Sequence, residues 1–408
     1  MLNWLRKSTA YSVGQLATMA GWIGWGTSSG ETINERSALD VTAVFCGARV
    51  IAEGLAQMPV RLMSVAADQA TGLPVWKPMV DHWAHQLLAV RPNAWQTSYE
   101  FREGMIFNAV VGMGAVAIKN VVNGEVRELL PVPANAWSIE QRADWSLQIR
   151  VDYSDKTHGY FDLSQVFYIR GPSVDGYKAL PVFQQAREAI GLSKALEKQQ
   201  AKLAGNGGKP SGVLAFANKL TPETTDKLRD TWQSRFGPGG EGGIAVLDGD
   251  AKFYPMTMTS VDSQTLESRR LQIEEIARAL RVQPIMLMQA DKAATYASAE
   301  QMFRMHVIHT LGPWIERFEQ AANRDILGNE TGLTFDMDER NLLRGDFKDQ
   351  AEYYTKALGA GGQPAWMTVN EIRSEVGLNP ISDEWANTVS RGAMQPQEAT
   401  NGNQAPSA

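Results

Sequence analysis

The stretch that decides the fold extends from Ser263 to Leu327 and reads SQTLESRRLQIEEIARALRVQPIMLMQADKAATYASAEQMFRMHVIHTLGPWIERFEQAANRDIL. Its first part is charged, with apolar residues close to every seventh position, namely Leu266, Ile273, Ile276, Ala277 and Leu280. So narrow an apolar seam predicts a long helix that packs against other helices and is not buried in a core. Pro284 ends this helix, and a loop of small and polar residues follows up to Ser298.

A second long helix is predicted after that loop. Ser298 and Gln301 have the spacing of a capping box. Beyond them an apolar stripe continues through Phe303, Val307, Leu311, Trp314, Phe318 and Ala322. Pro313 removes one backbone hydrogen bond from this helix and predicts a kink. The whole stretch therefore indicates a moving or gating part, because two long helices flank a loop and no catalytic cluster lies in it.

Composition limits the classes of protein to which the chain can belong. With 408 residues, of which 44% are hydrophobic, two or three globular domains are expected. The 39 Lys and Arg against 45 Asp and Glu give a net charge of -6, which argues against tight wrapping of nucleic acid and against docking on an anionic membrane. Cys46 is the only cysteine, so an intrachain disulfide and an all-cysteine metal site are excluded. We expect a soluble chain without signal peptide or membrane span.

The remaining elements are predicted from periodicity and caps, and together they indicate an α+β fold. Residues 1 to 36 are expected to form an arm that only a neighbour would order. Ser37 and Asp40 suggest a capping box before a core-facing helix that carries Val41, Val44, Phe45, Ala48, Ile51, Ala52 and Leu55. Period-two segments between Ala115 and Tyr168 predict a mainly antiparallel sheet, with a turn from Lys156 to Gly159.

A compact insert is predicted between two long helices. The first of these helices extends from Pro181 to about Ala204, and the second is the charged helix after Ser263. The insert, residues 211 to 257, contains a strand, a helix opened by Thr221 and Pro222, and two further strands. After it come a strand near Leu333, two short helices and a tail from about residue 387 that is expected to be disordered.

Motifs of known chemistry are incomplete in this sequence. Gly112 and Gly114 lie too close to Lys119 for a kinase, and neither the catalytic base nor the metal ligand of a kinase follows. Gly207-Gly208-Lys209 is followed by Pro210, where a phosphate loop needs a hydroxyl. The histidine pairs at 82 and 85 and at 306 and 309 lack further ligands. We therefore expect no catalytic residue, no metal and no cofactor.

Short segments in a fixed order carry a resemblance to a known family. These are Thr32–Glu35, Arg49–Glu53, Arg91–Trp95 with Phe101–Glu103, Ile169–Gly171, Ala186–Gly191, Asn206–Gly208 with Pro210–Leu214, Glu274–Arg278 with Pro284, Ala294–Tyr296 with Glu300–Gln301, Leu311–Trp314, Leu343–Asp346 and Asn370–Arg373. Over residues 32 to 380 the chain resembles the portal, or head-to-tail connector, proteins of tailed double-stranded DNA bacteriophages with long non-contractile tails. It departs from them at Met286–Gln289, which replaces the usual Leu-Leu-Gly, and in its N-terminal arm.

The resemblance implies a ring, typically of twelve subunits, around a tunnel for DNA. Such a subunit has an α/β wing, a stem of long helices, a small α/β clip and a helical crown. The corresponding division here is a flexible arm at 1–36, the wing at 37–180, stem helices at 181–204 and 263–283 around the clip at 205–262, the tunnel loop at 284–298, a kinked helix and return to the wing at 299–335, the crown at 336–385 and a disordered tail at 386–408.

The same resemblance implies where the partners bind. The tunnel loop would face DNA with Gln289, Asp291, Lys292, Thr295 and Tyr296, among which Lys292 would contact a phosphate. Alternatively, some of these side chains face a neighbouring subunit. In the clip, Trp232 and Arg235 would meet the large terminase subunit and later the head-tail connector (adaptor) protein. The expected location is the portal vertex of the capsid in the virion, beside the major capsid protein and after assembly in the cytoplasm of a bacterial host.

Two other classes remain open from the sequence. One is a ring or scaffold protein unrelated to phage, and the other is an enzyme whose site has no recognised motif.

Overall fold

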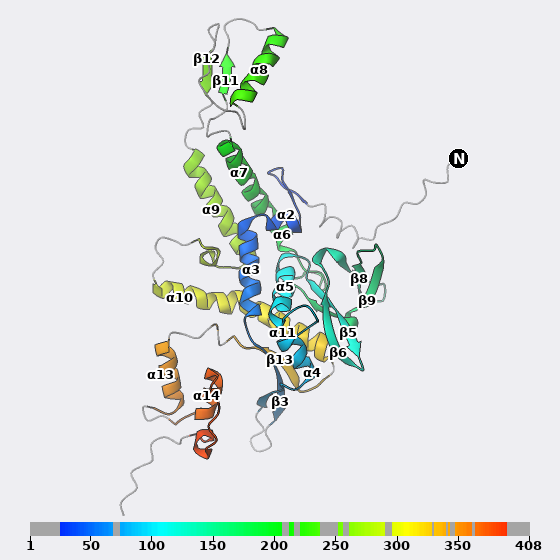
Figure 1. Cartoon of the computed structure of the whole chain (residues 1–408), viewed down its shortest axis with the longest axis vertical. Helices are drawn as coiled ribbons and strands as arrows, with labels where there is room; N and C mark the ends of the chain where they lie inside the picture. The colour runs from blue at the N-terminus through cyan, green and yellow to red at the C-terminus, as the bar shows by residue number, and fades with distance from the viewer. Residues whose placement is uncertain are drawn as a thin grey trace, which may run out of the picture. The chain divides into compact units, whose positions relative to one another are not determined.

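The computed structural model describes residues 25–67, 74–205, 212–215, 221–236, 252–255, 261–289, 296–328, 330–339, 342, 347–360 and 364–389 (Figure 1). The chain forms two compact units, of which the first ends at Asp338 and the second begins at Glu339. Helices and antiparallel sheets are mixed in the first unit, which confirms the predicted α+β class.

The first described segment is a hairpin followed by two helices. Strands β1 (Trp25–Gly26) and β2 (Thr32–Ile33) pair antiparallel and lead into α2 (Glu35–Leu39) and α3 (Thr42–Ala56). The predicted capping box of Ser37 and Asp40 is wrong. Asn34 is the N-cap of α2, where its Oδ1 accepts from the Ser37 N–H at 2.7 Å and its own N–H donates to the Ser37 Oγ at 2.9 Å. The predicted apolar stripe of α3 is buried except for Phe45, which is 44% exposed.

Three of the antiparallel sheets described in the first unit have three strands each. Strand β3 (Val60–Ala67) lies between β4 (Pro74–Pro78) and β13 (Leu333–Met337), and β5 (Ala115–Val122) lies between β6 (Glu125–Pro131) and β10 (Val166–Ile169). The third sheet consists of β7 (Trp137–Gln141), β8 (Leu147–Asp152) and β9 (His158–Asp162). The segment that predicted a single sheet therefore folds into two. The turn predicted up to Gly159 ends earlier, because only Lys156 has a left-handed backbone, with φ of 68°, and β9 begins two residues later.

The core of the first unit lies where helices cover these sheets. Helix α5 (Ser98–Val111) begins with a capping box of Thr97 and Glu100 and follows α4 (Trp83–His85) and the π-helical turn η1 (Gln86–Val90). Phe101 of α5 stacks on Phe167 of β10 at 6.4 Å between ring centroids, and Phe167 meets Phe318 edge-on at 5.9 Å. These rings join helices and a strand that are up to about 200 residues apart in sequence.

Two long helices pack side by side in the first unit (Figure 1). They are α7 (Arg187–Gly205), which follows the short α6 (Val182–Gln185), and α9 (Val261–Leu280). A guanidinium N–H of Arg269 on α9 donates to the Gln200 Oε1 on α7 at 2.6 Å. We expected the apolar positions of α9 to pack against other helices without being buried in a core. This is wrong for the second half of α9, because Ile276, Ala277 and Leu280 are buried and α9 also packs on α3. Gly47 of α3 makes room for Leu280, whose Cδ1 lies 2.5 Å from where a Cβ on residue 47 would be.

The second part of the deciding stretch is a helix interrupted by π-helical turns. It comprises α10 (Tyr296–Met305), η5 (His306–Leu311), α11 (Gly312–Ala322) and η6 (Asn323–Leu327). Helix α10 begins at Tyr296, so the predicted start at Ser298 is wrong by two residues. The irregularity predicted at Pro313 takes the form of η5, which ends just before it. A proline ring clashes with the carbonyl four residues earlier, and the wider turn relieves that clash.

The remaining described elements are small. In the insert, β11 (Gly212–Ala215) pairs with β12 (Lys252–Pro255), and α8 (Pro222–Phe236) lies between them in sequence. The strand predicted at 244–247 lies outside the described residues. Short 3₁₀ turns are η2 (Ala134–Ala136) and η3 (Leu163–Gln165). The second unit contains α13 (Phe347–Ala357), α14 (Val369–Val376) and η7 (Glu384–Asn387). Among the helices described, none combines the length and apolar character that a bilayer span requires.

Candidate functional site

The loop between α9 and α10 is anchored at its base by backbone geometry. Helix α9 ends in a Schellman motif, in which the Val282 N–H donates to the Ala277 carbonyl at 2.9 Å and the Arg281 N–H to the Arg278 carbonyl at 3.1 Å. Arg281 adopts the left-handed conformation that glycine usually supplies, with φ of 58°. Its carbonyl accepts a hydrogen bond from the hydroxyl of Thr310, a buried residue of η5, at 2.6 Å. The two arms of the loop are therefore tied together at this point.

The first turn of the loop is η4 (Pro284–Leu287), which folds back on α3 and α9. Met288 ends it with a second left-handed residue, φ 59°, and is 89% exposed. Gln289 then turns inward, because its backbone N–H donates to the Pro284 carbonyl at 3.2 Å and its Nε2 to the Glu274 Oε1 at 3.4 Å. The Gln289 Oε1 is buried without a partner among the described residues. Gln289 thus lies against α9 in this conformation of the chain.

For the other six predicted site residues, the structure describes the backbone alone or nothing. Asp291, Lys292 and Thr295 lie outside the described residues. Tyr296 is the first residue of α10, and Trp232 and Arg235 belong to α8, but their side chains lie outside the described part. The structure therefore brings only Gln289 into contact with another element, and the roles of all seven residues stay predictions.

One histidine of each pair, His82 and His306, lies in surroundings typical of a structural residue. The His82 Nδ1 accepts from the Ala84 N–H at 3.2 Å and so caps α4, and its Nε2 lies 3.3 Å from the Glu330 Oε2. His306 is buried in η5, and burial lowers the pKa of its imidazole. In the described part of the chain no group of three His, Cys, Asp or Glu side chains lies close enough together to hold a metal ion.

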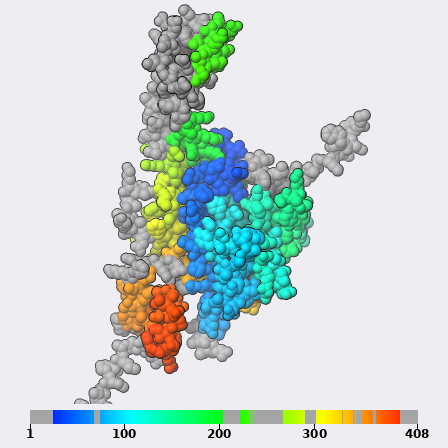
Figure 2. All heavy atoms as spheres, viewed as in Figure 1, coloured from blue at the N-terminus to red at the C-terminus, as the bar shows by residue number. Residues whose placement is uncertain are grey.

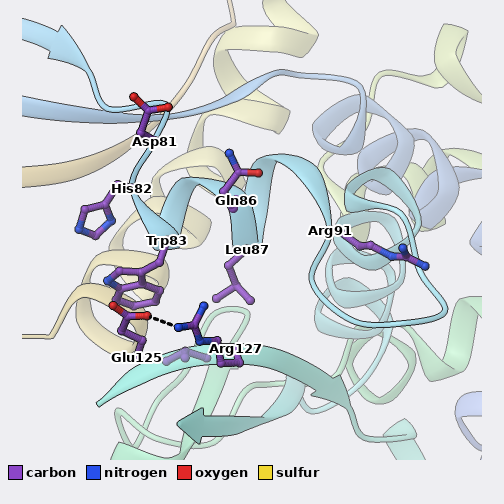
Figure 3. Close-up of a pocket in the computed structure, with 9 residues that line it drawn as sticks. Asp81, His82, Trp83, Gln86, Leu87, Arg91, Glu125 and Arg127 are labelled. Carbon is purple, nitrogen blue, oxygen red and sulfur yellow. Dashed lines mark ion pairs between the residues drawn. The ribbon is translucent and has the colours of Figure 1, made fainter. Parts of the chain in front are cut away.

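A surface pocket of about 680 Å³ lies between the α4–η1 segment and β6 (Figure 3). Charged, polar and apolar side chains line it together, namely Asp81, His82, Trp83, Gln86, Leu87, Arg91, Glu125, Val126 and Arg127. Glu125 and Arg127 form an ion pair at 2.8 Å, and Arg91 donates to the Ala94 carbonyl at 2.6 Å. No sequence pattern indicates this pocket, because its residues come from two segments about 40 positions apart that show no shared motif.

The N-terminal hairpin, residues 25–33, is attached to α7, so this part of the expected arm is held by its own chain; residues 1–24 of that arm lie outside the described residues. The Ser28 N–H donates to the Glu188 Oε2 at 3.0 Å, and the Lys198 ammonium lies 2.6 Å from both carboxylate oxygens of Glu31. Thr27 fits against Gly191, where a Cβ would come within 2.7 Å of the threonine side chain. We call residues 25–33 the clasp. No local pattern predicts it, since its partners lie about 160 residues away.

A buried polar cluster holds the far end of the second long helix to the sheet. The carboxylate of Asp325 accepts from the Tyr168 N–H at 2.9 Å and pairs with Arg324 at 2.6 Å, and the Lys119 ammonium donates to the Asp325 carbonyl. Burial lowers the pKa of Lys119, which the Asp325 charge partly offsets. The contacts of Tyr168 and Lys119 join η6 to β10 and β5, so the cluster fixes the helix that carries the loop at its other end.

Comparison with known proteins identifies the family. Residues 42–377 match the family model for phage portal proteins. A probable portal protein of Streptomyces phage phiC31 is 26% identical over 370 residues, covering 87% of this chain and 78% of the phage protein. The crystal structure of a phage portal protein of the HK97 family from Corynebacterium diphtheriae superposes with a TM-score of 0.56 at 17% identity, covering 75% of this chain and 95% of that one.

A second solved structure extends the likeness to an assembled particle. A chain from the neck of a native gene transfer agent particle, computed with C12 symmetry, has a TM-score of 0.57 at 21% identity and covers 90% of this chain and 99% of its own. Proteins of the matched family are structural components of virions, not enzymes. With more than half of its residues matched in one continuous segment, the chain belongs to the phage portal protein family and is a phage portal protein.

Proposed function

We propose that twelve copies of this chain form a ring at one vertex of the capsid, and that double-stranded DNA enters and leaves through its axial tunnel. The family match over residues 42–377 is the observation that carries this proposal. A likeness over 90% of the chain to a subunit from a neck computed with C12 symmetry supports the number twelve. The ring would be assembled in the cytoplasm of a bacterial host and would remain in the virion.

Imaging and mass measurement of the purified chain test the ring. Negative-stain images should show rings with an axial hole, and native mass spectrometry should give a mass near twelve times 44.9 kDa. A chain that stays monomeric or dimeric at every concentration and salt would overturn the proposed ring.

The regions of the subunit are proposed to act as their counterparts in the family do. Residues 37–180 and 299–335 would form the wing, 181–204 and 263–283 the stem, 205–262 the clip and 336–385 the crown. The clip, with Trp232 and Arg235, would bind the large terminase subunit during filling and the adaptor protein afterwards, while the wing would contact the major capsid protein. Deletion of residues 211–257 should abolish capture of the large terminase subunit in a pull-down while the wing still folds.

The loop at 284–298 is proposed to meet the DNA. Gln289, Asp291, Thr295 and Tyr296 would line the constriction and Lys292 would touch a phosphate. The net charge of -6 supports weak contact, because a tunnel lined with many cations would hold every phosphate and oppose sliding.

Replacement of Lys292 tests that contact. Lys292→Ala should leave ring formation intact and should alter the length of DNA packaged or retained, measured by nuclease protection in an in vitro packaging assay. Lys77→Ala, on the exposed strand β4, is the matched control. Packaging and retention equal to those of the unmodified chain would exclude a role for Lys292.

A further inference from the structure

Helices α3 and α5 pack antiparallel and present an exposed ladder of side chains. Phe45, Arg49 and Glu53 on α3 are spaced by one helical turn, as are Tyr99, Glu103 and Phe107 on α5. Phe45 meets Phe107 edge-on at 6.1 Å between centroids, and Phe45 and Tyr99 are 44% and 40% exposed. We call these six residues the α3–α5 face. In Figure 2, blue and cyan atoms from the part of the chain that contains α3 and α5 lie at the surface toward the viewer.

The middle of the α3–α5 face is charged and has a net negative charge. Arg49 pairs with Glu53 at 2.6 Å, and this carboxylate and, more weakly, Glu103 raise the pKa of the arginine. Burial raises the pKa of Tyr99, and the negative charges of Glu103 and Glu53 raise it further. Two carboxylates against one guanidinium leave one negative charge between aromatic ends, and such a face fits a partner that is apolar with an added positive charge.

Gly104 gives a second indication that something packs here. It lies in the interior of α5 beside Glu103, where glycine is the poorest helix former after proline. Apart from its chain neighbours and the adjacent backbone of α5, a Cβ at residue 104 would meet no atom of the described residues within 4 Å. The chain's own packing therefore gives no reason for glycine, whereas close approach of another backbone does.

Helix α10 has the complementary properties. Phe303, Met305 and Ile308, which lies in the adjoining η5, are 54%, 46% and 51% exposed, and Arg304 lies among them. The described part of α10 packs mainly on η5, the next turn of the same helix, and Figure 1 shows it extending away from α3 and α5. Apolar side chains that the described part of their own chain leaves uncovered are typical of a contact with a partner.

We propose that α10 and η5 of one copy dock on the α3–α5 face of the next copy and form the repeating contact of the ring. The aromatic ends of the face would receive Phe303 and Ile308, Arg304 would meet Glu53 and Glu103, and Gly104 would allow the helix backbone to approach. Because the two surfaces differ, the contact is head-to-tail, which is the kind that generates a closed ring. The inference rests on the proposed ring and names the surfaces that join its subunits.

Charge reversal tests the contact. Glu103→Arg and Arg304→Glu should each lower the fraction of chain found in rings by native mass spectrometry at least about tenfold, and the two changes together should restore it. Glu128→Arg, on β6 outside the face, is the matched control and should leave assembly unchanged. Rings that tolerate both single reversals, or a double variant no better than the single ones, would overturn the proposal.

Two further measurements separate this interface from the ring itself. With p-benzoylphenylalanine in place of Phe45, irradiation of rings built from isotopically mixed copies should crosslink position 45 to residues 301–311 of another copy. Crosslinks from intact rings to a different segment would refute this interface and leave the ring standing, whereas an unmodified chain that never assembles would refute the ring. Gly104→Ala should raise the Tm of the unassembled chain by about 2 °C and yet weaken assembly; equal or better assembly would contradict close approach.

Discussion

Glu35 shows how a single buried carboxylate affects stability in this fold. It is the first residue of α2, where the helix dipole favours an anion, but its Oε1 lies close to Gly112 at the carboxyl end of α5, where the dipole opposes one. A Cβ at residue 112 would come within 2.9 Å of that oxygen. Burial raises the pKa of Glu35 above its ordinary value of 4.5, so the folded chain holds this proton more tightly than the unfolded chain does.

The sign of the pH dependence follows from that shift. A carboxyl with a raised folded-state pKa contributes its full stability below the unfolded pKa and loses it as the pH rises through the folded value. Glu35→Gln should therefore raise the free energy of unfolding at pH 7, and the gain over the unmodified chain should shrink as the pH falls toward 4. Urea unfolding at several pH values measures the difference.

Glu100→Gln is a control with the opposite sign. Hydrogen bonds from the backbone and hydroxyl of Thr97 lower the pKa of Glu100. This carboxylate therefore stabilises the fold at pH 7, and its contribution is lost as the pH falls through the folded pKa. A Glu35→Gln variant that is less stable than the unmodified chain at pH 7 would contradict the account of Glu35.

At the scale of elements, periodicity predicted most helices and strands to within a few residues. The apolar stripe of α3 and Pro222 at the start of α8 carry local signals strong enough for that. Sequence patterns did not predict the features that depend on contacts between residues far apart in the chain. The clasp, residues 25–33, depends on Glu188 and Lys198, and the burial of the α9 seam depends on α3, more than 200 residues earlier.

The candidate site was less predictable than the fold. Gln289 was placed at a constriction by resemblance, but the structure directs its amide to Glu274 on α9, a contact that depends on left-handed residues at 281 and 288. Neither is glycine or asparagine, so composition gave no sign of these turns. The α3–α5 face was hidden for another reason, since its residues alternate with the buried stripes of both helices and resemble an ordinary solvated surface.

The prediction at the scale of elements concerns the attachment of the clasp, residues 25–33, to α7. Gly191→Ala adds a methyl group that would lie 2.7 Å from the Thr27 side chain and 2.9 Å from its Cβ, so the hairpin must move. The amides of residues 25–33 should lose about tenfold in hydrogen-exchange protection, or about 1.4 kcal/mol, while those of α7 keep theirs because alanine favours a helix. Gly104→Ala, where a Cβ meets no described atom outside the adjacent part of α5, is the control when both variants are measured as unassembled chains. Undiminished protection of the hairpin would show that Thr27 does not fasten it.

At the scale of the whole molecule, a single family match covers residues of both units, but each unit is compact by itself. The matched segment, 42–377, crosses the boundary at Asp338. The last contacts of the first unit lie just before that boundary. Strand β13 pairs with β3 from Val60 to Ser64, and the carboxylate of Asp338 forms an ion pair with Arg61 at 2.7 Å. The strands and rings that make up its core all lie before Glu339.

A chain truncated after Asn341 should therefore fold on its own. It keeps β13 and the Arg61–Asp338 pair, so its Tm should lie within about 3 °C of the corresponding transition of the full chain, and hydrogen exchange of β3 should be unchanged. A chain ending at residue 331 removes β13 and is the matched comparison, which should expose β3 to exchange and lower the Tm strongly. Because α10 and the α3–α5 face lie in the first unit, the chain truncated after Asn341 should also assemble. Folded subunits that form no ring would instead assign a necessary contact to the second unit.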